Sequence, residues 1–149
     1  MGYPTDATSW PKATPSSVIQ LIDLHFSLLD TKSETIGERL AGEVFTEHGI
    51  FMAANGTFEG RDAITTCRKG AWGNVISRRH QVNKAFLNDR DADALDLILV
   101  GAVDVEMADG AKHRHEFVTR SVVVGADSGN PRVQHYQVLI PTPRTSQKA

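Results

Sequence analysis

The sequence of 149 residues has a single cysteine, Cys67. One thiol can form no disulfide bond within the chain and cannot build a zinc cluster of thiolates. The sequence also lacks an apolar run of the roughly 18 residues that a membrane-spanning helix needs. Its first ten residues, MGYPTDATSW, are polar and do not resemble a secretion signal. We therefore expect a cytoplasmic protein that does not contact a membrane.

An excess of charge of one sign is also missing. The 16 basic residues are nearly balanced by 18 acidic residues, which gives a net charge of −2 with neutral histidines. The basic residues are scattered along the chain, and Arg78-Arg79 is only a short pair. Because nucleic-acid-binding surfaces usually carry a clustered positive patch, we expect no nucleic-acid partner.

The composition is otherwise that of an ordinary folded domain, with 40% apolar and 23% charged residues. Residues 1–14 contain two prolines and many small polar side chains, so we expect a flexible N-terminal arm there. Residues 15–140 are expected to form one α+β domain. The proline-rich segment 141–149 is expected to be a flexible C-terminal tail.

Helical periodicity is confined to the first half of the chain. Apolar residues three and four positions apart predict a helix that ends near Leu29-Asp30 and a second helix over residues 33–45. The dipeptide Asn55-Gly56 predicts a tight turn between two short strands. A third helix is expected over residues 62–71.

From Val75 onward the apolar pattern has a period of two residues, which predicts long strands. The expected strands cover residues 77–88, 94–107, 112–124 and 132–140. Together with the two short strands they predict an antiparallel sheet of six strands, and with the helices an α+β fold.

The expected turns allow cross-strand neighbours to be predicted. A turn centred on Asp109-Gly110 would place Asp104 opposite His115, and a loop at residues 89–91 would place His80 opposite Val100. One face of the sheet would then be apolar apart from a few ionisable groups, as in a small-molecule pocket. The residues expected on this face are His80, Val82, Phe86, Ile98, Val100, Ala102, Asp104, His115, Phe117, Thr119, Ser121 and His135. A shift of one residue in register would send them to the opposite face.

The other face of the sheet would be unusually apolar for a surface in contact with water. It would carry Leu95, Leu97, Leu99, Val103, Val118 and Val122. An exposed apolar patch of this kind is typical of a subunit interface, so we expect a homodimer formed through the outer face of the sheet.

Four segments carry a resemblance to a known family: a first helix that ends in Leu29-Asp30, Val44–Gly49, Phe58–Ile64 with the sequence FEGRDAI, and Arg79-His80 at the start of the long strands. Over about residues 16–140 the chain resembles the nuclear transport factor 2-like (NTF2-like) superfamily and, within it, the SnoaL-like and scytalone dehydratase-like group. The resemblance implies a cone-shaped, curved antiparallel sheet wrapped around N-terminal helices, a cystatin-like α+β barrel with a buried cavity.

The resemblance also implies roles for individual residues. In dehydratases of this group, a histidine at the start of the third strand is the acid/base and an aspartate at the end of the first helix lies beside it; His80 and Asp30 match these positions. The dehydratases have a tyrosine immediately before that aspartate, whereas this chain has Leu29. Polyketide cyclases of the group use an aspartate on a strand as base, for which Asp104 is the candidate.

Two further activities of the superfamily match less well. Ketosteroid isomerase-like members have an aspartate base in the first hairpin strand, where this chain has Ala53. Members that resemble limonene epoxide hydrolase use an Asp–Arg–Asp set; here Asp104 fits, Ala102 stands in place of the arginine, and His135 falls near the second aspartate.

We therefore expect a small cofactor-independent enzyme that acts on an apolar, polyketide- or terpenoid-like metabolite by general acid/base chemistry, as a dehydratase, isomerase or cyclase. The expected catalytic residues are His80, Asp30 and Asp104. The expected substrate-binding residues are His115, His135, Phe26, Phe51, Phe86, Phe117 and Val100. No metal is expected. The alternatives are a non-catalytic ligand-binding or dimerising module of the same fold and an epoxide hydrolase-like enzyme.

Overall fold

The structure is a computed structural model that describes residues 3–140. The predicted C-terminal tail, residues 141–149, lies outside the described residues. A short 3-10 helix, η1 (Tyr3–Thr5), opens the described chain.

The longest helix is α1 (Ser16–Leu29), as the apolar spacing predicts. Its buried stripe consists of Val18, Leu21, Ile22, His25, Phe26, Leu28 and Leu29. The second predicted helix is shorter and in two parts, because α2 (Ile36–Arg39) continues into a π-helical turn, η2 (Leu40–Val44). The third, α3 (Gly60–Thr65), starts and ends earlier than predicted.

Six strands form one sheet in the order β2-β1-β6-β5-β4-β3. The strands are β1 (Phe45–Ala53), β2 (Gly56–Glu59), β3 (Val75–Asp91), β4 (Ala94–Met107), β5 (Lys112–Val124) and β6 (Arg132–Ile140). The α+β class is confirmed. The sheet is mixed rather than purely antiparallel, because β1 pairs in parallel with β6. It is also open, with β2 and β3 at its two edges, so it does not close into a barrel.

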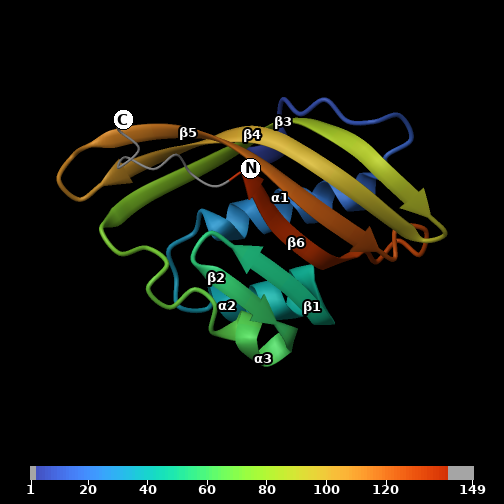
Figure 1. The fold of residues 1–149 in the computed structure, drawn as a ribbon, viewed down its shortest axis with the longest axis horizontal. Helices are drawn as coiled ribbons and strands as arrows, with labels where there is room; N and C mark the ends of the chain where they lie inside the picture. The colour runs from blue at the N-terminus through green and yellow to red at the C-terminus, as the bar shows by residue number, and fades with distance from the viewer. Residues whose placement is uncertain (1–2, 141–149) are drawn as a thin grey trace.

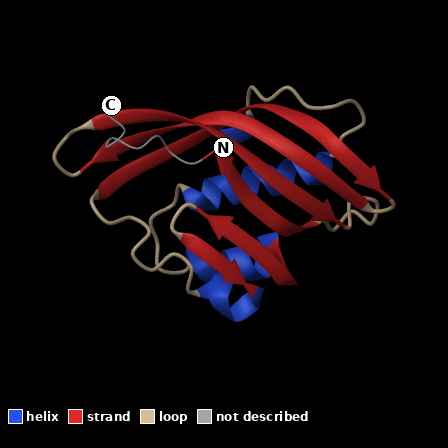
Figure 2. Ribbon diagram, in the orientation of Figure 1, coloured by secondary structure: helices blue, strands red, loops and turns tan. Residues whose placement is uncertain are grey.

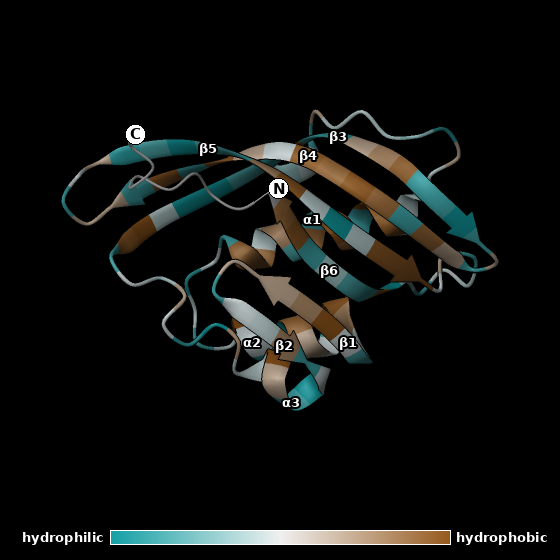
Figure 3. Ribbon diagram, viewed as in Figure 1, coloured by the Kyte–Doolittle hydropathy of each residue, from teal (hydrophilic) through white to brown (hydrophobic). Residues whose placement is uncertain are grey.

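The long strands curve over α1, which lies between them and the small unit made of β1, β2, α2 and α3 (Figures 1 and 2). The most apolar parts of the long strands are the middle of β4 and the C-terminal end of β5 (Figure 3). No helix of the described chain is long and apolar enough to cross a bilayer.

The turns between the long strands differ from the prediction by small shifts. The β3–β4 turn is Ala92-Asp93, with Asp91 paired to Ala94, and β3 also contains irregularities near Asn83 and Asn88. His80 therefore pairs with Val103 instead of Val100. The observed partner of His80 is thus three residues further along β4 than the predicted one. Because successive residues of a strand face opposite sides of the sheet, an odd shift exchanges the two faces.

The exchange corrects the predicted faces of β4. Leu95, Leu97 and Leu99 were expected outside but are buried on the inner face, and Val103 lines the cavity beside them. Val100 and Asp104, expected inside, alternate with these residues and lie on the outer face.

The outer face is consequently less apolar than predicted. Of the six residues expected there, Val118 and Val122 remain, half-buried, between inward-facing neighbours. The dimer stays a prediction, and it now rests on these valines together with large apolar side chains that are exposed elsewhere: Ile76, Phe86, Leu87 and Leu139.

The N-terminal segment is held against the domain, in contrast to the predicted flexible arm. Thr5 donates a hydrogen bond to Asp23 over 2.6 Å, and Thr8 donates to the carbonyl oxygen of Val82 over 2.5 Å. Ser9 pairs with Lys84 as an added bridge at the edge of β3. The described part of the segment, residues 3–14, therefore covers the edge of the sheet and α1.

Gly101 in β4 shows how closely the cavity wall is packed. A Cβ atom at this position would overlap the carbonyl oxygen of Gln81 and would lie 2.7 Å from the ring of Phe117. Phe117 is buried against this glycine and forms part of the cavity wall. The absence of a side chain at residue 101 is therefore what allows the ring to pack against β4.

We expect Gly101→Ala to lower the free energy of unfolding by about 1–3 kcal/mol, because backbone and ring must move to admit the methyl group. Gly42→Ala is the matched control, since a Cβ there meets nothing within 4 Å, and it should change stability by less than about 0.5 kcal/mol. Urea unfolding of the two variants measures the difference. Equal stabilities would contradict the packing described here.

Candidate functional site

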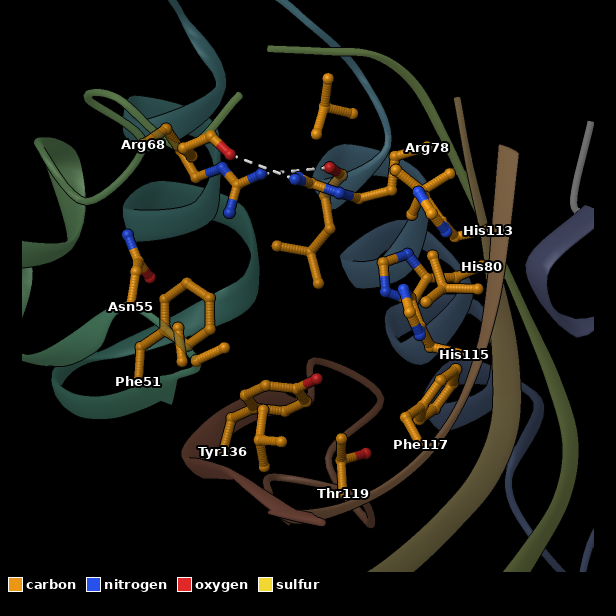
Figure 4. A pocket seen from close by; sticks show the side chains of 18 of the residues that line it. Phe51, Asn55, Arg68, Arg78, His80, His113, His115, Phe117, Thr119 and Tyr136 are labelled. Atoms are coloured by element: carbon orange, nitrogen blue, oxygen red, sulfur yellow. Dashed lines mark hydrogen bonds between the residues drawn. The ribbon is translucent and has the colours of Figure 1, made fainter. Parts of the chain in front are cut away.

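A cavity of about 720 Å³ opens between the inner face of the long strands, the end of α1 and the β1–β2 hairpin (Figure 4). This volume is in the range of small-molecule sites. Its apolar wall includes Phe51, Val103, Val105 and Phe117. The polar side chains that line it are Asn55, Arg68, Arg78, His80, His113, His115, Thr119 and Tyr136.

Asp30 is the most enclosed carboxylate of the site, with a side chain only 2% exposed. It follows the last residue of α1, where the helix dipole disfavours a negative charge. Three donors compensate for this position. One carboxylate oxygen accepts hydrogen bonds from the Tyr3 hydroxyl and from the backbone N–H of His80, both over 2.7 Å, and the other lies 2.5 Å from Nδ1 of His80.

His80 projects from β3 between Asp30 and the cavity, and its side chain is 14% exposed. Its ring lies 5.3 Å from that of Phe26 and 5.4 Å from that of Phe117, measured between centroids. A carboxylate that accepts from Nδ1 holds the neutral ring in the tautomer with its proton on Nδ1. Nε2 is then left free on the cavity side, with the lone pair that a general base needs.

The remaining sequence-predicted residues divide into two groups. His115, Phe51 and Phe117 line the cavity with His80, and Phe26 is buried behind His80. Phe86, with 46% of its surface exposed, and Val100 and His135 lie on the outer face, so their predicted contact with a substrate in this cavity is wrong. For Phe86 the cause is the irregularity after Val82, and for His135 a register in which Tyr136 takes the inward position.

Asp104 also lies on the outer face. It forms an ion pair with Arg114 over 2.8 Å, and 48% of its side chain is exposed. It does not line the cavity, and β4 separates it from His115, whose partner across the strands is Val103. The prediction of Asp104 as a catalytic residue is therefore wrong for this cavity. The polyketide cyclase and epoxide hydrolase hypotheses both required the Asp104 carboxylate at the substrate site.

Tyr136 is a functional candidate that sequence reasoning missed. It is buried in β6 with its hydroxyl group directed at the cavity, near that of Thr119 (Figure 4). Burial raises the pKa of the phenol well above its usual value, so Tyr136 remains a hydrogen-bond donor at neutral pH. The predicted register of the last two strands differed by one residue and placed His135, the neighbour of Tyr136, on the inner face instead.

Arg68 and Arg78 were missed as well. Arg78 precedes His80 by two residues on β3 and so shares its face, which the period of the strand could have revealed. Arg68 follows α3 in a segment that was expected to be helical, and no sequence signal placed it at the cavity.

Two other ionisable groups have limited roles here. His25 is fully buried among Phe45, Phe51 and Tyr136, and burial lowers its pKa to about 3, so it stays neutral and acts as a packing group. Burial raises the pKa of the Cys67 thiol to about 11, which leaves little thiolate. Within residues 3–140, no three or more His, Cys, Asp or Glu side chains are grouped so that they could hold a metal ion.

Comparison with solved structures identifies the architecture. An NTF2-like superfamily protein from Salmonella enterica serovar Typhimurium LT2 superposes with a TM-score of 0.62 at 13% identity, over 90% of this chain and 95% of that one. The chain has the NTF2-like fold. This confirms the fold that the sequence resemblance implied.

Two further solved structures superpose with similar scores. A scytalone dehydratase-like protein from Novosphingobium aromaticivorans DSM 12444 has a TM-score of 0.67 at 14% identity, over 90% of this chain and 93% of that one. ActVI-ORFA from Streptomyces coelicolor has a TM-score of 0.63 at 21% identity, over 83% of this chain and 93% of that one. No family model and no curated protein matches the sequence.

Asp30 and Asp104 provide a matched pair for testing the site. Asp30→Asn replaces an acceptor of three hydrogen bonds in a buried position, so it should lower the free energy of unfolding by about 2–4 kcal/mol. Asp104→Asn breaks only an exposed ion pair and should cost less than about 1 kcal/mol. Urea unfolding at pH 7 measures both values. Equal losses would show that Asp30 is not the buried anchor described here.

Proposed function

We propose that this protein is a cofactor-independent enzyme that transfers protons on a small ring-containing metabolite, and that the reaction is a dehydration. The observation that carries the proposal is the buried Asp30–His80 pair, which leaves one imidazole nitrogen directed into a cavity of about 720 Å³. A closed void the size of a water molecule would have favoured a non-catalytic adaptor instead.

The first step is removal of a proton from the carbon next to a carbonyl group. Nε2 of His80 takes the proton, and the electrons of the broken C–H bond move into the carbonyl to give an enolate. The hydroxyl groups of Tyr136 and Thr119 lie on the wall of the same cavity and can donate hydrogen bonds to the enolate oxygen. Asp30 remains ionised and stabilises the imidazolium.

The second step expels the leaving group. The electrons of the enolate return to form the carbon–carbon double bond, and the C–O bond to a hydroxyl on the next carbon breaks. The His80 imidazolium gives its proton to that oxygen, so water leaves and the imidazole is neutral again. One histidine handles both protons, which requires that the hydrogen and the hydroxyl leave from the same side of the substrate.

The cavity wall supports a substrate with a flat apolar body. Phe117 and Phe51 lie on different sides of the space in front of His80 (Figure 4). Val103 lies between His80 and His115, and Val105 lies between Arg78 and His113. The likeness in fold to a scytalone dehydratase-like protein is consistent with this class of reaction. An isomerase would use the same first step and return the proton to another carbon.

A direct test uses 3-hydroxy-1-tetralone, a ring-fused β-hydroxy ketone that becomes 1-naphthol when it loses water. We expect the protein to accelerate this conversion, followed by the absorbance of 1-naphthol, and His80→Asn to lower kcat/KM at least about 100-fold because the proposed base is removed.

His135→Asn is the matched control, since His135 lies on the outer face of the sheet. It should retain kcat/KM within about threefold, which is less than the effect of a lost catalytic group. The proposal fails if His80→Asn folds normally and keeps comparable activity, or if the unsubstituted protein gives no rate above that of buffer.

A further inference from the structure

The lining of the cavity is unbalanced in charge. Two arginines and three histidines face it, whereas no aspartate or glutamate is among its lining residues. The nearest carboxylate, Asp30, lies behind His80 and accepts its hydrogen bonds from His80 and Tyr3. The cavity is therefore basic as well as apolar, although the protein as a whole has a net charge of −2.

Arg78 is held in place by groups that do not neutralise it. One of its terminal nitrogens donates to the carbonyl oxygen of Ala71 over 3.1 Å, and its guanidinium lies 4.6 Å from the centre of the Trp72 ring. These contacts fix the plane of the guanidinium and leave its other donors available. Within residues 3–140, Arg78 forms no ion pair with a carboxylate.

Arg68 is held in a similar way on the neighbouring segment. One terminal nitrogen donates to the carbonyl oxygen of Leu29 over 3.2 Å. Its Nε is buried and has no hydrogen-bond partner among residues 3–140. A buried donor without a partner on a charged group is costly, and within residues 3–140 Arg68 forms no ion pair with a carboxylate.

The two guanidinium groups lie at the same end of the cavity, whereas Tyr136 and Thr119 lie at the opposite end (Figure 4). Burial lowers the pKa of both arginines, and the positive charge of Arg68 lowers that of Arg78 further. Each arginine is thus partly removed from water, and within residues 3–140 neither forms an ion pair with a carboxylate, although the charge of Asp30 acts on both. An anion between them would compensate both charges.

We propose that the substrate carries a carboxylate, which Arg68 and Arg78 bind at the end of the cavity away from Tyr136 and Thr119. This inference rests on the proposed function, which makes the ligand a substrate. It adds an acidic group to the flat apolar ring system proposed for that substrate. The planar donor fork of arginine matches a carboxylate in two-point contacts. Because each guanidinium already donates to a backbone carbonyl, the remaining donors suit the two oxygens of a carboxylate better than the larger acceptor set of a phosphate.

The proposal also explains how a substrate could be oriented. A carboxylate at the arginines and a carbonyl group at Tyr136 and Thr119 would fix the two ends of a ring system, and the carbon between them would face His80 (Figure 4). Binding at a distance from the reacting carbon can be used to hold the reactive geometry.

The test compares two probes of nearly the same shape, 2-naphthoate and 2-naphthamide, by isothermal titration calorimetry at pH 8. We expect the acid to bind at least about tenfold more tightly than the amide, since only the acid can pair with buried arginines. In Arg68→Gln and Arg78→Gln this preference should fall to less than about threefold, while the affinity for the amide, which reports an intact cavity, should stay within about twofold.

Arg61→Gln is the matched control, because Arg61 is exposed on α3 and does not line the cavity; it should keep the full preference. His80→Asn should also keep it, so that a failure of the proposed catalysis can be told apart from a failure of this inference. The inference is overturned if the unsubstituted protein binds the amide as tightly as the acid, if it binds neither, or if the preference survives both arginine substitutions.

Discussion

Asp30 is a carboxylate at the C-terminal end of a helix, where the dipole disfavours it, and it is nonetheless almost completely buried. What makes this possible is a set of three donors from two distant segments: the hydroxyl of Tyr3, and the backbone N–H and ring Nδ1 of His80. The same contacts join the N-terminal segment, α1 and β3. They also orient the imidazole of His80, which lines the cavity, so the folding constraint and the proposed chemistry depend on the same carboxylate.

The curvature of the sheet supplies the space in front of this pair. β4 and β5 present Val103, His115 and Phe117 to the cavity, and Gly101 allows the ring of Phe117 to lie against the strand. β6 adds Tyr136, whose buried phenol is packed against His25 with ring centroids 4.6 Å apart. The result is an apolar space with the imidazole of His80 on one wall, the hydroxyl groups of Tyr136 and Thr119 at one end and two arginines at the other.

Much of the fold could be predicted from the sequence. The bounds of β4, β5 and β6 follow from the period-two pattern and its turn residues, and the spacing of apolar residues gives α1 within two residues. The proximity of Asp30 to His80 was expected only through the resemblance to dehydratases of this fold, since the two residues are 50 positions apart. Those dehydratases have a tyrosine immediately before the aspartate, where this chain has Leu29. Here the hydroxyl of Tyr3 donates a hydrogen bond to the carboxylate of Asp30 instead.

The contents of the cavity were harder to predict because strand faces alternate with every residue. A difference of one residue in the β4–β5 register moved Asp104 from the pocket to an exposed ion pair with Arg114, and small irregularities in β3 did the same to Phe86. Arg68 lies outside any regular element, where periodicity gives no direction. Local pattern thus predicts which residues form a strand more reliably than which side of the sheet each one faces.

We infer that Asp30 fixes the proton of His80 on Nδ1 and leaves Nε2 free for the substrate. Nitrogen-15 NMR of labelled protein at pH 8 measures this directly, through the chemical shifts of the two imidazole nitrogens assigned by comparison with His80→Asn. The account predicts that Nδ1 of neutral His80 is the protonated nitrogen, and that this preference weakens in Asp30→Asn. A proton found on Nε2 of neutral His80, with Nδ1 bare, would contradict it.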